Sequence, residues 1–319
     1  MIPALELTQL GKSYDHGRSI IVKDFNLRVS DGEFVCIIGH SGCGKSTVLS
    51  IAMGLNDASE GGVIIAGREV TGPGLDRGVV FQSSALLPWL TARENVLLAV
   101  DQCQDRHSQR IRHGLAEKYL LAVGLEGVAD TYPEELSAGM RQRVGIARAL
   151  ALEPKVLLLD EPFSLLDVVT RMELQDQVMR LCAQENKTVL MVTHDVDEAL
   201  LLSDRIVMMT NGPAATVGEI LGVPFARPRD RLTLSEEPTY HQLRGRMLSF
   251  LEERAPERVA TPAQQKSEAL EQPAHLTAQE AFIIEKYTGF NRFRGKYRKF
   301  ETTANRDVNS ASVESKALA

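Results

Sequence analysis

The sequence is poor in cysteine and in aromatic residues, and it has no long apolar run. Its only cysteines are Cys36, Cys43, Cys103 and Cys182, and none belongs to a C-x-x-C pair, which argues against a zinc ribbon and a disulfide framework. No stretch of about 18 apolar residues is present, so no segment is expected to span a bilayer. The first residues lack a charged segment followed by an apolar one, so we also expect no signal peptide. Any membrane role must then come through partners.

Basic charge is also scarce, since the chain of 319 residues carries a net charge of −6. An acidic total argues against a protein that coats nucleic acid, which needs a basic surface, so we expect no nucleic-acid partner. The charge is unevenly distributed, because residues 255–319 contain ten Lys and Arg against eight Asp and Glu, and six of the seventeen aromatic residues. This contrast predicts a main domain over residues 1–254 and a C-terminal extension over residues 255–319 that begins with a polar linker.

Short apolar runs alternate with helical patterns, which predicts an α/β fold. The runs around residues 36, 157 and 190 are apolar throughout, as in strands that are buried on both faces of a parallel sheet. We predict the strands of this sheet at residues 33–38, 78–81, 156–159, 188–192 and 205–209. Three earlier runs alternate apolar with polar residues and predict an antiparallel piece beside the main sheet, at residues 4–9, 20–29 and 62–66.

Helices are predicted over residues 45–55, 110–123, 137–151 and 168–185. Ser137 begins the third of these patterns, and its side chain can accept a hydrogen bond from the first helical turn, so we predict it to be an N-cap. Residues 86–136 interrupt the alternation of strands and helices with mostly helical patterning. Together with the helix that follows, they predict a helical subdomain over about residues 86–152, inserted into the α/β core.

One stretch fits the pattern G-x-x-x-x-G-K-[ST] between a predicted strand and a predicted helix: Gly39-His40-Ser41-Gly42-Cys43-Gly44-Lys45-Ser46. The glycines allow backbone N–H groups to surround phosphate oxygens, and the helix N-terminus adds partial positive charge. Lys45 is predicted to bridge the β- and γ-phosphates of a nucleotide and Ser46 to ligate Mg²⁺, with Thr47 next in the loop. Cys43 is interpreted as a small space-filling residue. The alternative is an ordinary glycine-rich turn, which the flanking strand and helix argue against.

Polar residues follow four predicted strands at one edge of the sheet. After residues 156–159, Asp160 can hold Mg²⁺ through water, and Glu161 can polarise an attacking water as a general base. His194 follows the next strand and can reach the γ-phosphate, while Gln82 follows another strand and can contact Mg²⁺ or water. A lone histidine is more often structural, and each signal is weak by itself. Together with the glycine-rich loop, these residues predict a site that hydrolyses a nucleotide.

A further stretch carries a family resemblance: Leu136-Ser137-Ala138-Gly139-Met140, followed by Arg141-Gln142-Arg143-Val144-Gly145. It resembles the signature motif and helix of ATP-binding cassette (ABC) ATPases. The order of phosphate loop, Gln82, signature, Asp160-Glu161, residues 164–167 and His194 is similar to that family, and the resemblance covers residues 4–250. It implies a P-loop cassette with a RecA-like parallel-sheet core, an antiparallel β subdomain and an inserted helical subdomain, with ATP and Mg²⁺ as cofactors. The extension over residues 255–319 is predicted to be partly disordered.

The resemblance also implies roles that spacing alone does not give. Tyr14 matches the aromatic residue that stacks on adenine; without the resemblance it would be a surface tyrosine in a β-turn. Two cassettes, either two copies or two related subunits, are expected to close head to tail, so that ATP lies between the phosphate loop of one and Ser137 and Gly139 of the other. This sequence differs from the usual signature L-S-G-G-Q at Ala138 and Met140. Turnover is predicted to be retained, with its rate altered by the extra methyl group of Ala138.

Residues 73–82 and 86–96 resemble importers of nitrate, sulfonate and taurine, and residues 208–215 and 224–231 resemble the nitrate/nitrite, cyanate and bicarbonate subgroup. These resemblances imply the ATP-hydrolysing subunit of an importer for a small anion, nitrate or nitrite before sulfonate, taurine, bicarbonate or cyanate. Its partners would be transmembrane permease subunits and, indirectly, a periplasmic solute-binding protein. The chain would lie peripherally on the cytoplasmic face of the inner membrane. A non-transport ABC ATPase of DNA repair or translation is the alternative from another class.

Two features stay open at this point. Trp89, the only tryptophan, is either an exposed anchor at a partner interface or a core residue of the helical subdomain. Residues 281–300 interleave aromatic with basic residues. This segment either contacts anionic lipid or the permease, or forms a solvated appendage.

Overall fold

The structure is a computed structural model that describes residues 3–103 and 108–253. The predicted C-terminal extension, with its basic and aromatic segment at residues 281–300, lies outside the described residues. The division of the chain between residues 254 and 255 therefore stays a prediction.

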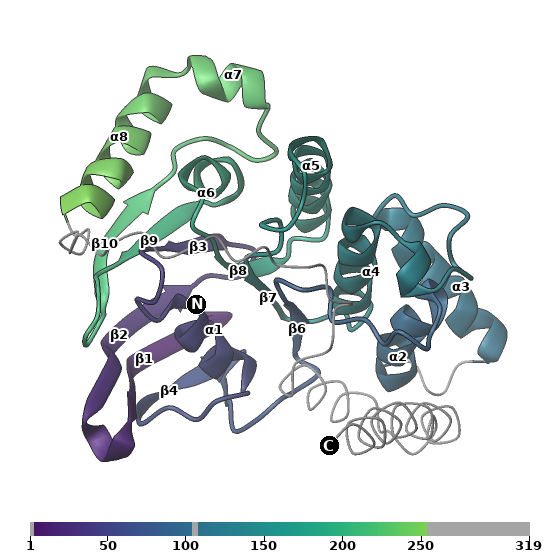
Figure 1. The fold of residues 1–319 in the computed structure, drawn as a ribbon, viewed down its shortest axis with the longest axis horizontal. Helices are drawn as coiled ribbons and strands as arrows, with labels where there is room; N and C mark the ends of the chain where they lie inside the picture. The colour runs from purple at the N-terminus through teal and green to yellow at the C-terminus, as the bar shows by residue number, and fades with distance from the viewer. Residues whose placement is uncertain (1–2, 104–107, 254–319) are drawn as a thin grey trace, which may run out of the picture.

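A six-stranded sheet forms the centre of the fold (Figure 1). Five of its strands are parallel, and the last, β10, pairs antiparallel with β9. This arrangement confirms the predicted α/β class with a parallel core. In spatial order the strands are β10 (Val217–Gly222), β9 (Arg205–Met209), β3 (Phe34–Ile38), β8 (Thr188–Val192), β7 (Val156–Asp160) and β6 (Arg77–Val80).

The parallel strands are apolar on both faces because both faces are covered. Along β3, Phe34, Cys36 and Ile38 belong to one buried cluster. This cluster includes residues of α4 (Ala138–Leu150), α5 (Val168–Gln184), α6 (Val196–Leu202) and α8 (Pro238–Glu253). The alternate residues Val35 and Ile37 belong to a second cluster, formed with α1 (Lys45–Met53) and with a separate antiparallel sheet. Side chains of a strand point alternately to its two faces, so a strand between two layers must be apolar at every position.

An antiparallel sheet lies beside the parallel one (Figure 1). Its strands, in spatial order, are β2 (Ser19–Val29), β1 (Leu5–Tyr14), β4 (Glu60–Ile65) and the short β5 (Arg68–Glu69). It confirms the antiparallel piece predicted from the alternating runs. A 3₁₀ turn at Asp15–Gly17 joins β1 to β2 within this sheet, and helix α1 (Lys45–Met53) lies in the chain between β3 of the parallel sheet and β4 of the antiparallel sheet. A second 3₁₀ turn, at Pro133–Glu135, lies between α3 and α4.

Three helices pack against one another at one side of the sheet (Figure 1). They are α2 (Ala92–Cys103), α3 (Gln109–Ala122) and α4 (Ala138–Leu150). Helix α4 also contacts β6 and α5 (Val168–Gln184), so it connects this helical group to the sheet. Trp89 is half-buried and packs against Leu87, Leu90 and Leu98. It is therefore neither a fully exposed anchor nor a fully buried core residue.

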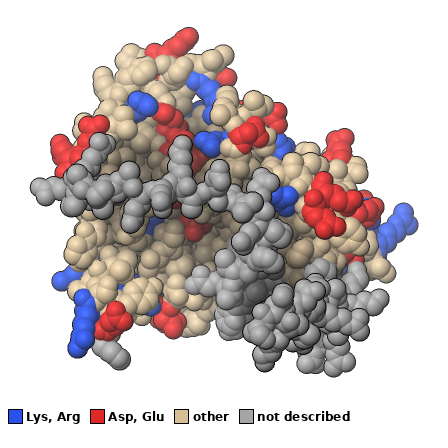
Figure 2. All heavy atoms as spheres, viewed as in Figure 1, with Lys and Arg blue, Asp and Glu red and all other residues tan. Residues whose placement is uncertain are grey.

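The last part of the described chain adds elements that the sequence patterns did not predict. These are α6 (Val196–Leu202), β10, α7 (Arg231–Glu236) and α8 (Pro238–Glu253). Among the described residues no helix combines the length and apolarity needed to cross a bilayer. Basic and acidic side chains both occur across the face of the molecule drawn in Figure 2.

Candidate active site

The carboxyl ends of β3, β8 and β7 lie next to one another, and the residues that follow them meet there. The amide of Thr193 donates to the carbonyl of Ile37 at 3.1 Å, and the amide of Glu161 donates to the carbonyl of Val192 at 2.9 Å. These bonds continue the sheet ladder beyond the strands. They hold the segments carrying Glu161 and His194 beside the loop that follows β3, at the sheet edge where ligands bind in open α/β folds.

The phosphate loop runs from the end of β3 into α1. Lys45 is only 6% exposed, and its Nζ donates to the carbonyls of Gly39 and His40, each at 2.8 Å. Gly44 has φ +102°, and a Cβ there would lie 2.9 Å from Val22 Cγ2, so only glycine fits without displacement. Within the described part of the chain, no side chain caps the first turn of α1, so the first amides of this helix face the loop. Such a helix N-terminus is suited to bind an anion.

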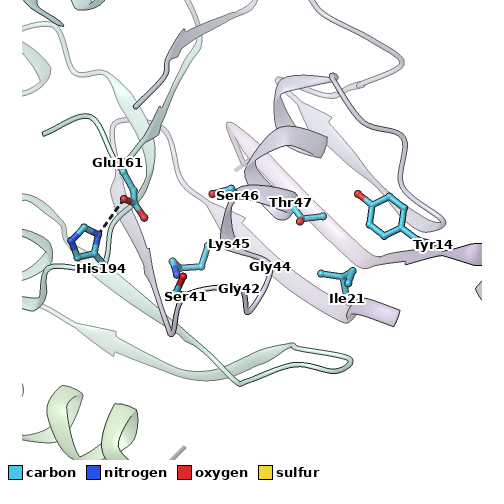
Figure 3. Close-up of a pocket in the computed structure, with 10 residues that line it drawn as sticks. All are labelled: Tyr14, Ile21, Ser41, Gly42, Gly44, Lys45, Ser46, Thr47, Glu161 and His194. Atoms are coloured by element: carbon cyan, nitrogen blue, oxygen red, sulfur yellow. Dashed lines mark hydrogen bonds and ion pairs between the residues drawn. The ribbon is translucent and has the colours of Figure 1, made fainter. Parts of the chain in front are cut away.

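The loop lines a cavity of about 490 Å³. Figure 3 shows its residues, with Glu161 and His194 at one end, the loop in the middle and Tyr14 at the other end. A side chain at each end and backbone amides between them suit an elongated ligand with an anionic part. The lining residues are Tyr14, Ile21, Ser41, Gly42, Gly44, Lys45, Ser46, Thr47, Glu161 and His194.

Ser46 and Asp160 bring two oxygen ligands together at the loop. Ser46 Oγ donates to Asp160 Oδ1 at 3.2 Å. Burial raises the pKa of Asp160 above its ordinary value, and the hydrogen bond from Ser46 acts in the opposite direction. A hard divalent cation prefers oxygen ligands and favours the ionised carboxylate, so these two residues fit Mg²⁺. Within the described part of the chain, no cluster of three or more His, Cys, Asp and Glu side chains could hold a metal without other ligands.

Glu161 and His194 form a pair across the cavity end (Figure 3). His194 Nδ1 lies 3.2 Å from Glu161 Oε2, and the His194 side chain is 63% exposed, compared with 21% for Glu161. Glu161 has φ +43°, in the left-handed region that a residue with a side chain occupies only at a cost. The carboxylate of Glu161 is thus fixed by its backbone and by His194, at a place where it can take a proton from water.

Three residues of the predicted phosphate loop lie outside the cavity lining. They are Gly39, His40 and Cys43. Cys43 is 3% exposed, and burial raises the pKa of its thiol, so this residue fills space and is not activated as a nucleophile. The side chain of His40 points elsewhere, with Nε2 2.6 Å from the carbonyl oxygen of Leu251 in α8.

Gln82 also lies outside the cavity lining. The strand β6 ends at Val80, two residues before Gln82, and the Gln82 side chain is exposed. Its Nε2 donates to Ser164 Oγ at 3.1 Å, and Ser164 Oγ donates to the carbonyl of Glu161 at 3.0 Å. Among the hydrogen bonds of the described residues, Gln82 is therefore connected to Glu161 through Ser164.

Ser137 and Gly139 stand at the start of α4, away from the cavity lining. Ser137 is exposed, and its Oγ accepts from the amide of Met140 at 3.2 Å, which confirms the predicted N-cap. Gly139 is buried, and a Cβ on it would lie 2.3 Å from Thr170 Cγ2 in the first turn of α5. Packing of α4 on α5 within one chain is enough to require glycine at this position.

Two residues at the site were not predicted from the sequence. Ile21 lines the cavity beside Gly44, and Ser164 connects Gln82 to Glu161. The family pattern includes residues 164–167, which was a signal for Ser164. Nothing in the alternating pattern of β2 distinguishes Ile21 from its neighbours.

Comparisons with known proteins identify the family. The family model for the ABC transporter matches residues 22–164, which include the phosphate loop, the signature and Glu161. The bicarbonate transport ATP-binding protein CmpD of Synechocystis is 52% identical over 235 residues, covering 74% of this chain and 83% of that protein. The chain belongs to the ABC transporter family.

Within the ABC transporter family, the relatives differ in length. The nitrate import ATP-binding protein NrtC of Synechococcus elongatus is 54% identical over 237 residues. These residues make up 74% of this chain and 36% of NrtC, so the chain spans about a third of that relative.

A solved structure has the same fold. It is the dimeric post-hydrolysis state of an ATP-binding cassette bound to ADP and Pi, with a TM-score of 0.62 and 34% identity over 70% of this chain and all of that one. The present chain therefore carries an ABC ATPase domain.

Proposed function

We propose that the chain is the ATP-binding and ATP-hydrolysing subunit of an ABC importer for a small anion, with nitrate or nitrite as the first candidate. The observation that carries the ATPase assignment is the cavity at the phosphate loop, with Lys45 at its centre and Glu161 and His194 at one end. The observation that favours an anion is the high identity to proteins named for nitrate import and for bicarbonate transport.

The triphosphate lies along the loop in this proposal. Backbone amides of Ser41, Gly42 and Gly44 and the Nζ of Lys45 neutralise the β- and γ-phosphates, while the Tyr14 ring stacks on adenine. Tyr14 is 45% exposed at the far end of the cavity, so its ring is accessible to a base. Gly39, His40 and Cys43 shape the loop from outside the cavity.

Mg²⁺ would be held by Ser46 and Asp160, with Gln82 as a further candidate, and would supply charge neutralisation for the phosphates. Glu161 accepts a proton from the attacking water, and His194 lies close enough to Glu161 to fix its orientation and to contact the γ-phosphate. Because Gln82 is exposed and tied to Ser164, it would have to change partner to reach the cation.

A second cassette completes the site in this proposal. Ser137 and Gly139 do not line the cavity of their own chain, and Ser137 is exposed at a helix N-terminus. A helix N-terminus that faces outward suits the γ-phosphate held by another chain. The dimeric arrangement described for the solved relative is consistent with this role.

In the transport part of the proposal, the chain binds to permease subunits at the cytoplasmic face of the inner membrane. The exposed Gln82 and the adjoining helical group, with the half-buried Trp89, would form the surface that couples ATP hydrolysis to the permease. A periplasmic solute-binding protein would select the anion. Domain boundaries at residues 254 and 255 and at about 86–152 are part of this proposal.

The test uses the full chain reconstituted with a candidate permease and a candidate solute-binding protein from the same organism. ATP hydrolysis in liposomes should be stimulated by the solute-binding protein loaded with nitrate or nitrite, and Glu161→Gln should abolish that stimulation. Stimulation by bicarbonate or by a sulfonate, without a response to nitrate, would reassign the substrate. If no permease copurifies and the chain instead binds DNA or ribosomes tightly, the proposed transport role is wrong.

A further inference from the structure

The last turn of α8 contacts the phosphate loop through His40. The Nε2 atom of His40 lies 2.6 Å from the carbonyl oxygen of Leu251. A carbonyl only accepts hydrogen bonds, so Nε2 is the donor. Leu251 is in the final turn of α8, where carbonyls lack a partner within the helix and the helix dipole is negative. The His40 side chain therefore caps α8 from outside.

The backbone of the same residue contacts Lys45. The carbonyl of His40 accepts from Lys45 Nζ at 2.8 Å, beside the similar bond to Gly39. His40 is thus linked to α8 by its side chain and to Lys45 by its main chain. Since His40 does not line the cavity, any influence of its side chain on a nucleotide must pass through the loop backbone and Lys45.

Helix α8 is itself firmly held near this contact. Met247 is fully buried, and Phe250 is 6% exposed and lies over Gly218, where a Cβ would come within 2.5 Å of the Phe250 ring. A support packed in this way restricts the position of the Leu251 carbonyl.

The first half of α8 is fixed to α6. Tyr240 Oη and Arg244 Nε donate to Asp197 Oδ1 at 2.6 and 2.7 Å. Asp197 stands three residues after His194, so α8 also contacts the segment that follows His194. Helix α8 is therefore attached at two points, to the loop that follows β3 and to α6, which follows β8.

We propose that His40 is a positioning residue that couples α8 to Lys45 and thereby presets the phosphate loop for nucleotide binding. A loop held in its bound form loses less freedom when the ligand arrives, so the tether strengthens binding. The effect should fall on nucleotide affinity and on KM, and much less on kcat, because His40 touches no reacting atom. This inference rests on the proposed role of Lys45 as a phosphate ligand.

The first test compares His40→Leu with His40→Gln in the full chain. Leucine keeps bulk but has no donor, whereas the glutamine amide offers a donor at a similar reach. We expect His40→Leu to weaken binding of a fluorescent ATP analogue about fivefold and to raise KM similarly, as loss of one hydrogen bond would. His40→Gln should remain within about twofold of the wild type, since it restores that bond. Equal weakening by both substitutions, or none by leucine, would overturn the proposal.

The second test is a double-mutant cycle with Phe250→Leu, which loosens the last turn of α8 over Gly218 but keeps an apolar side chain. If His40 acts through α8, His40→Leu should lose most of its effect in the Phe250→Leu background. Full additivity of the two changes would show that α8 is not the route. Lys45→Ala is the separate control for the underlying role: unchanged ATP binding in that variant would contradict the proposed function, whatever the His40 variants do.

Discussion

The phosphate loop and the start of α4 both carry motifs of the ABC family, yet their surroundings contrast. Lys45 is 6% exposed, hydrogen-bonded to two carbonyls and part of a cavity. Ser137 is exposed, and its Oγ accepts only from Met140 in its own helix among the hydrogen bonds of the described residues. The contrast supports the proposal that one chain builds the phosphate-binding half of a site and presents a second half to another chain.

The two regions also owe their shape to different forces. The phosphate loop is fixed by close packing, because β2 leaves no room for a side chain at Gly44. The start of α4 is fixed by its N-cap and by the contact of Gly139 with Thr170. Substitutions in the loop should therefore act within one chain, whereas those at Ser137 should act on the partner.

The largest effect is expected for Lys45→Ala. Removing the buried ammonium takes away the main positive charge facing the phosphates, so ATP binding by the isolated chain should fall by about a hundredfold or more. Fluorescent-nucleotide titration measures this directly. Lys23→Ala, which changes an exposed lysine, is the matched control and should bind as the wild type does. Near-normal binding after Lys45→Ala would remove the loop from the site.

Glu161→Gln should separate binding from chemistry. Glutamine keeps the shape of the side chain but cannot accept a proton from water, so hydrolysis should fall by about a hundredfold or more while ATP binding persists. Phosphate release measures the first quantity and nucleotide titration the second. Glu134→Gln, at an exposed position, should leave both unchanged. Hydrolysis at the wild-type rate in Glu161→Gln would place the general base elsewhere.

Ser137→Ala changes the start of α4 and leaves the phosphate loop intact. Hydrolysis should fall about tenfold because a γ-phosphate ligand is lost, while ATP binding to the separate chain stays unchanged. Loss of the cap should also lower the free energy of unfolding by about 1 kcal/mol, measured by denaturant titration. Ser108→Ala is the control for the cap, because Ser108 precedes α3 without capping it through its side chain.

A mixture of the Lys45→Ala and Ser137→Ala chains sharpens this result. In a head-to-tail pair, one composite site would contain both substitutions and the other would contain neither. Mixing should then raise hydrolysis above that of either chain alone. A mixture no more active than its components would mean that the exposed start of α4 does not serve a partner.

The smallest effect is expected for Ala138→Gly. Ala138 is exposed at the first turn of α4, so the change removes one methyl group facing outward and makes the backbone more flexible. We expect ATP binding to stay constant and the hydrolysis rate to change by about twofold, since less than 1 kcal/mol is at stake. An unchanged rate would show that the departure from the usual signature has no consequence for turnover.

The sequence was sufficient to predict the elements that a short, local residue pattern marks. The apolar runs predicted at residues 188–192 and 205–209 coincide with β8 and β9, and Ser137 caps α4 as predicted. It was insufficient where few apolar residues mark an element, as in α8, whose fully or largely buried residues are only Met247 and Phe250. The bond between His40 and Leu251 joins residues 211 apart in the chain, and no local pattern encodes such a contact.

The residues of the candidate site also divide into those that a local motif predicts and those that depend on long-range contacts. The loop motif led directly to Lys45 and Ser46, because a short pattern encodes a short structure. The place of Gln82 could not be predicted, since it depends on where β6 ends and on the partner that Ser164 provides.

The backbone of Glu161 has a consequence for how such a chain could evolve. A residue with a side chain held at φ +43° carries a strain of roughly 1–3 kcal/mol. Glycine would relieve that strain, yet it would remove the carboxylate. In a lineage released from selection for hydrolysis, drift toward glycine at this position would stabilise the fold, so glutamate persists only while turnover is selected.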